Sequence, residues 1–236
     1  MTEQQWLTTD QVTWLLSSAE TVCSARKLAM FQLECARPLA EAEDDSELSA
    51  LYRQVEFTLT EDMPVEMMEE VTAAARRYAT SLNELLFQAV AEAPGKTGRR
   101  FVRECSQAAV AAFLMHDALS PEGWWRVTTD IDEGPELDRY FAFEGFREAW
   151  CQQNIPLLRC IVGNPFRPVT FEPSWRTATA VTLAAGIYEE RAFDRLPILA
   201  DALEEAGCDH ANVLTHCRGP GPHARGCWVV DGVLGK

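Results

Sequence analysis

The chain has 236 residues, of which 47% are apolar and 24% charged, so it is large enough for one well-buried core or two small domains and is not disordered as a whole. Its 36 acidic and 21 basic residues give a net charge of −15, which argues against a nucleic-acid backbone as the main partner and disfavours binding to anionic membranes. No signal peptide and no apolar stretch of about 18 residues is present, so we expect a cytoplasmic protein with mostly reduced thiols.

The first third of the chain predicts helices. Thr9 and Asp10 cap a short helix that carries Val12, Leu15 and Leu16 at helical spacing. A second helix from 24 to 43 directs five apolar residues to a core: Leu28, Phe31, Leu33, Cys35 and Leu39. Between 41 and 70 there are eleven acidic residues and one basic residue, either a solvated face or a contact for a basic partner. Residues 55–60 are the one short stretch with strand-like alternation.

The middle of the chain continues this helical pattern. Pro64 opens a long helix to about 93, and a further helix is expected over 98–119. The break at 94–98 superficially resembles a phosphate loop, but Val90 stands where the first glycine belongs, so we reject nucleotide binding. The acidic run at 130–138 fails the calcium-loop pattern and is interpreted as the entry to a helix from about Pro135 towards Cys160.

Four prolines between 156 and 173 mark a connector, and the best domain boundary lies between residues 162 and 163. Beyond it we expect helices over 174–191, 196–206 and 209–217, with Gly207 as a helix-terminating glycine, and a last apolar element over 228–234. The sequence therefore predicts an all-α, multi-helix bundle of antiparallel helix pairs. It has a helical N-terminal and central region, 1–162, and a compact helical C-terminal subdomain, 163–236.

Several C-terminal segments, together with two near the N-terminus, resemble a family of uncharacterised proteins from planctomycete bacteria. The segments are GNPFRPV (163–169), LPILADALE (196–204), HCRGPGPH (216–223), RGCWVVD (225–231), EQQWL (3–7) and RKLAMF (26–31). The resemblance implies membership of that family but no activity. Family members often carry several cysteines after the opening phenylalanine, whereas this chain has only Cys35 there.

Chemistry is concentrated in the last 30 residues. Three of the eight cysteines and three of the four histidines fall within 20 positions: Cys208, His210, His216, Cys217, His223 and Cys227. Thiolates and imidazoles so close together could bind zinc, and the predicted ligands are Cys208, His216, His223 and Cys227. No pair with C-x₂-C spacing is present, so the alternative is core packing, in which Asp209 caps a helix and the Gly219–Pro222 turn directs His223 at a backbone carbonyl.

Catalytic signatures are weak. A cysteine nucleophile with a histidine base would use Cys217 or Cys227, but the sequence offers no third orienting residue. His116 and Asp117 are better explained as a helix end than as half of a triad. We therefore expect a non-enzymatic helical module without a cofactor that binds a protein partner, with tryptophans such as Trp124, Trp125 or Trp175 as exposed anchors. The alternative is a zinc-stabilised or thiol-dependent protein centred on the C-terminal cluster.

Overall fold

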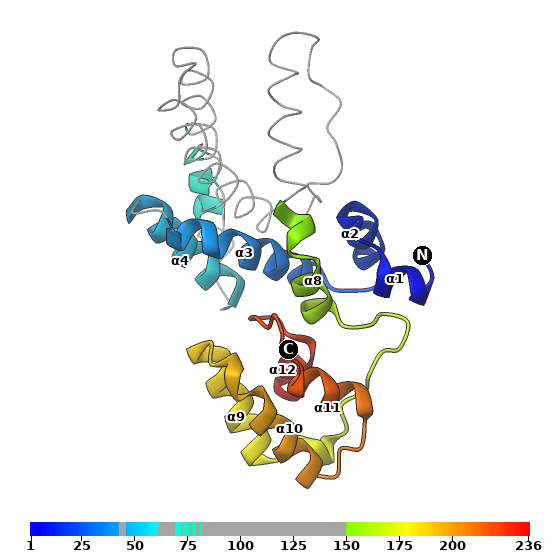
Figure 1. Ribbon diagram of the computed structural model, residues 1–236. Coiled ribbons are helices and arrows are strands. Elements are labelled where there is room, and N and C mark those ends of the chain that lie inside the picture. Colours follow the sequence, from blue (N-terminus) through cyan, green and yellow to red (C-terminus); the bar gives the residue numbers. More distant parts are fainter. Residues whose placement is uncertain (43–45, 61–68, 72, 76, 79–80, 82–149) are drawn as a thin grey trace. The chain divides into compact units, whose positions relative to one another are not determined.

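The computed structural model describes residues 1–42, 46–60, 69–71, 73–75, 77–78, 81 and 150–236. Helices make up most of these residues, and no strand occurs among them, so the predicted all-α class is confirmed (Figure 1). The helices are α1 (Glu3–Thr8), α2 (Val12–Glu20), α3 (Ala25–Ala42), α4 (Ser46–Thr60), α8 (Ile155–Val162), α9 (Ala178–Glu190), α10 (Leu196–Glu205), α11 (Ala211–Arg218) and α12 (Trp228–Leu234), with 3₁₀ turns η1 (Pro173–Trp175) and η2 (Phe193–Arg195).

The chain forms two compact units. Unit 1 consists of residues 1–10, 21–23 and 154–236, and unit 2 consists of residues 11–20 and 24–153. The predicted boundary between residues 162 and 163 lies inside unit 1, because α8 packs against α12 and contributes Cys160 to the C-terminal core. Unit 1 is therefore discontinuous in sequence.

In unit 2, α3 packs against both α2 and α4. The apolar residues predicted to face the core of α2 and α3 are buried: Val12, Leu15, Leu16, Leu28, Phe31, Leu33, Cys35 and Leu39. Residues 55–60, which alternate like a strand, belong to helix α4, since burial of Leu48, Leu51 and Val55 on one helical face outweighs this short alternation. The described parts of the predicted helix over 64–93 are also helical, and Val71 and Ala75 are buried there.

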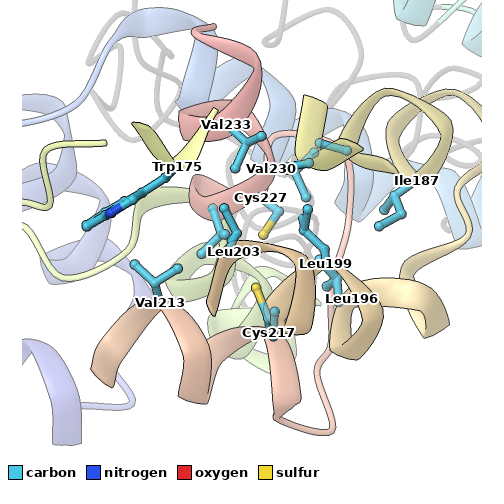
Figure 2. Close-up of a cluster of buried hydrophobic side chains, with 14 of the residues drawn as sticks. Trp175, Ile187, Leu196, Leu199, Leu203, Val213, Cys217, Cys227, Val230 and Val233 are labelled. Atoms are coloured by element: carbon cyan, nitrogen blue, oxygen red, sulfur yellow. The ribbon is translucent and has the colours of Figure 1, made fainter. Parts of the chain in front are cut away.

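In unit 1, helices α9 to α12 surround one apolar core (Figure 2). Leu199 and Leu203 of α10 lie in this core with Val213 and Cys217 of α11 and with Val230 of α12. Helix α10 ends as predicted, because Gly207 has a φ of +89° and the Cys208 amide donates to the Leu203 carbonyl at 2.9 Å. This turn brings the chain back so that α11 can pack against α10.

Three local predictions are corrected. The helix expected to run unbroken to Cys160 is interrupted at Asn154, because Pro156 lacks the N–H that a continuous helix needs and instead occupies the first turn of α8. The N-cap of α11 is His210, not Asp209. Trp175 is only 8% exposed and packs in the core against Phe171, so it cannot serve as a surface anchor.

Several other predictions lie outside the described residues: the break at 94–98, the helix over 98–119, His116 and Asp117, Trp124 and Trp125, and the acidic run at 130–138. Among the described helices, none combines the length and the apolar character required to cross a bilayer.

Candidate metal centre

Four side chains from three segments of unit 1 converge on one point: Cys160, His216, His223 and Cys227. Cys160 lies on α8, and His216 lies in the last turn of α11. The chain then passes through the Gly219–Pro222 turn to His223 and reaches Cys227, the N-cap of α12. The two thiols are buried, and the two imidazoles are partly buried.

The donor atoms are mutually close. The four ligand atoms, one from each residue, all lie within 4.8 Å of one another. His216 Nε2 lies 3.2 Å from Cys227 Sγ and 3.7 Å from Cys160 Sγ, and His223 Nδ1 lies 3.5 Å from Cys160 Sγ. A tetrahedral zinc ion with Zn–S bonds near 2.3 Å and Zn–N bonds near 2.0 Å separates its sulfur and nitrogen ligands by about 3.5 Å. The measured separations therefore bracket the distance that a tetrahedral S₂N₂ site requires.

The outer shell fixes the orientation of the two rings. His223 Nε2 lies 3.3 Å from the carbonyl oxygen of Gly219, which accepts a hydrogen bond from the N–H of that nitrogen and leaves the Nδ1 lone pair available to a metal. The sequence predicted this carbonyl contact. The His216 ring packs 5.3 Å from the indole of Trp228 and 4.8 Å from the His223 ring. The Nε2 side of His223 is thus held by a backbone carbonyl, and the His216 ring packs against Trp228 and His223.

Electrostatics favour a thiolate at Cys227. Burial raises the pKa of this thiol, but hydrogen bonding with Cys160, His216 and His223 outweighs it and holds the pKa well below its ordinary value. For His223, burial lowers the pKa, but the hydrogen bond and charge of Cys227 raise it overall. The positive charge of a bound zinc ion would stabilise this thiolate in place of a protonated histidine, because zinc binds cysteine as the thiolate and histidine as the neutral imidazole.

The structure brings together three of the four residues predicted as metal ligands, His216, His223 and Cys227, and places Cys160 rather than Cys208 beside them. Cys208 is buried behind the end of α10 and lies outside the cluster, and Cys160 takes the fourth position. Spacing in the sequence does not connect Cys160 with these residues, because it lies 56 residues before His216 in an apolar helix, where a free cysteine is ordinarily a core residue. The sequence contains only an indirect indication of Cys160: no fourth donor lies at a typical zinc-binding spacing from His216, His223 and Cys227.

Cys208 and Cys217 pack in the apolar core. Cys217 is fully buried in the apolar core (Figure 2). It does not join the cluster with its neighbour His216, because consecutive residues of a helix point to different sides. Its pKa is raised from 9.0 to about 12 by burial and by the nearby thiols Cys227 and Cys208, so the thiol stays protonated. The cysteines within the described ranges form no disulfide.

A nucleophile–base pair is the competing explanation of the 3.2 Å contact between His216 and Cys227. Cys227 has no exposed surface, however, so a substrate carbonyl could not approach its sulfur without opening the core. A third residue lies near the same sulfur, since the ligand nitrogen of His223 is within 4.8 Å of it. Convergence of two imidazoles on one buried thiol is typical of metal ligation rather than of a catalytic dyad.

No protein-family model, curated protein or solved structure matches this chain.

Proposed function

We propose that this chain is a non-enzymatic helical protein stabilised by one structural zinc ion, held by Cys160, His216, His223 and Cys227. The observation that carries the proposal is the convergence of two thiols and two imidazole nitrogens at separations of a tetrahedral S₂N₂ site. Tetrahedral coordination by soft thiolates and imidazoles suits zinc better than calcium or magnesium, which take oxygen ligands.

Four protein ligands are the pattern of structural zinc rather than catalytic zinc. A catalytic ion usually has three protein ligands and a water in the open position, whereas four protein donors complete the coordination. The donors here also join separate segments, since Cys160 belongs to α8 and the other three to residues 216–227. The ion would cross-link these segments and stabilise the folded state over the unfolded chain.

The experiment is metal analysis of purified protein. We expect one zinc per chain in the wild type and none in the double variant His223→Ala, Cys227→Ser. The matched control is Cys217→Ser, which changes a core thiol next to His216 but removes no ligand, and it should retain zinc. Wild-type protein that purifies without zinc and takes none up from added zinc sulfate would contradict the proposal.

A module of this kind would act by presenting a rigid surface to another protein. The net charge of −15 favours a partner with a basic surface, whose association would be screened by salt. Binding of a partner that copurifies with the chain should therefore weaken as salt is raised. Undiminished binding in high salt would contradict this electrostatic part of the proposal.

A further inference from the structure

We infer that the N-terminal segment, residues 1–10, is a strap that positions the metal ligand Cys160, and that zinc binding and docking of this strap stabilise each other. The inference rests on the proposed zinc site. The strap comprises α1 and the residues that follow it, and it belongs to the same compact unit as α8 and the C-terminal helices. It lies about 150 residues from α8 in sequence, so its contacts with α8 are tertiary contacts.

The first connection runs through Arg159, the residue before Cys160. Its guanidinium donates from Nε to the carbonyl of Trp6 at 3.0 Å and from a terminal nitrogen to the carbonyl of Thr9 at 2.7 Å. Both carbonyls lie near the C-terminal end of α1, where backbone acceptors lack helical partners. Two charge-assisted hydrogen bonds therefore tie the end of the strap to the helical turn that carries the ligand.

The second connection runs through Trp6 and Gly163. The indole of Trp6 is fully buried, and its N–H donates to the carbonyl of Gly163 at 3.1 Å. Gly163 ends α8 with a φ of +76°, and a Cβ placed there would come within 3.1 Å of the Trp228 indole. The Trp228 ring in turn packs on His216. A continuous series of contacts thus joins the strap to a second metal ligand.

A third connection is weaker. Glu3 pairs with Arg167 at 2.6 Å and accepts a hydrogen bond from Asn164 at 2.8 Å. The Arg167 side chain is 67% exposed, so solvent screens this ion pair and it adds little to stability. Trp6 and Arg159 are therefore the positioning residues on which the inference depends.

The need for a strap follows from the length of α8. An isolated helix of eight residues is not stable in water, so tertiary contacts must hold it in place. Cys160 is the one ligand of the four outside residues 216–227, and its position depends on α8. Because coupling between two binding events is reciprocal, a docked strap raises zinc affinity and bound zinc raises the occupancy of the docked strap.

The first test measures zinc affinity by competition with a chelator in the full chain. We expect Trp6→Phe, which deletes the indole donor, and Arg159→Gln each to weaken zinc binding roughly tenfold, the lower end of the effect of outer-shell substitutions. The matched control is Trp14→Phe, since Trp14 is 62% exposed on α2 of the other unit, and this variant should bind zinc like the wild type.

The second test needs no variant. Hydrogen exchange of the backbone amides in residues 3–10 of the wild type should slow on addition of zinc, with no equal change in α4 of unit 2. Zinc binding that leaves exchange in 3–10 unchanged, with unaltered affinity in Trp6→Phe and Arg159→Gln, would overturn the strap while leaving the zinc site intact. A wild type that binds no zinc would overturn the proposed function itself, and the strap with it.

Discussion

At the scale of single residues, the position of a cysteine in the fold decides whether it can serve as a metal ligand, and the local density of cysteines and histidines in the sequence does not. Cys208 and Cys160 are both buried thiols of unit 1, but only Cys160 places its sulfur beside both imidazoles. Cys208 lies in the turn that ends α10 and packs in the apolar core. The two cysteines therefore form a matched pair for testing which residues hold the metal.

We predict that Cys160→Ser lowers zinc affinity by at least tenfold, because it removes one of four ligands, and that Cys208→Ser keeps full zinc content. The serine at 208 buries a hydroxyl in an apolar site and should cost about 1–3 kcal/mol of stability, measured by urea unfolding. Loss of zinc from Cys208→Ser with retention in Cys160→Ser would restore the ligand set predicted from sequence.

Cys217 gives a prediction on pH. Its folded pKa is raised from 9.0 to about 12, so between these values the unfolded chain releases a proton that the folded chain keeps. The stabilising contribution is complete below pH 9 and is lost as pH rises towards 12, at up to about 1.4 kcal/mol per pH unit.

Urea unfolding at pH 8, 9 and 10 measures this loss. The free energy of unfolding should fall more steeply for the wild type than for Cys217→Ala, since the variant lacks the titrating thiol and shares the other alkaline groups. Parallel curves for the two proteins would show that Cys217 is not the group responsible.

Part of the site could be predicted from these residues and part could not. The density of cysteine and histidine residues points to His216, His223 and Cys227, which the structure brings together, and the turn glycines indicate that His223 meets a backbone carbonyl. The partner of these three lies 56 residues upstream, and no spacing rule connects two donors that meet only after α8 has docked. Tertiary packing, not local pattern, brings the fourth donor to the cluster.

At the scale of helices, periodic segments were predicted well and interruptions less so. The apolar spacing in α2 and α3 gives the buried faces directly, because each repeats over enough turns to dominate the pattern. The break at Asn154 depends on Pro156, and the end of α9 depends on Arg191, which has a φ of +52°. A positive φ in a residue other than glycine leaves no clear signal in the sequence.

Helix α12 gives a prediction at this scale. Gly232 faces the ring of Phe171, and a Cβ at that position would overlap the ring. We predict that Gly232→Ala destabilises unit 1 by about 1–3 kcal/mol, because α12 would have to move away from the segment before α9. Thermal unfolding measures the effect.

The matched control is Gly186→Ala in helix α9, where a Cβ meets nothing within 4 Å. An added methyl group at this helical position should be neutral or stabilising by about 1 kcal/mol. Equal stability of the two variants would contradict the close packing of α12 on Phe171.

At the scale of the whole molecule, the described residues form two compact units, and the proposed ion belongs entirely to one of them. Unit 1 collects residues from both ends of the chain, and its contacts to α8 come from the N-terminal strap, from α12 and from the metal ligands. A single ion at this junction would link the stability of the unit to metal supply, because binding to the folded state alone shifts the folding equilibrium.

X-ray absorption at the zinc edge of the purified wild-type protein is the sharpest test of the proposed zinc site, because it counts the donor atoms around the bound ion. We predict four-coordinate zinc with two sulfur ligands at about 2.3 Å and two nitrogen ligands at about 2.0 Å. A spectrum with only oxygen and nitrogen neighbours, or with a sulfur count other than two, would contradict a centre formed by Cys160, His216, His223 and Cys227.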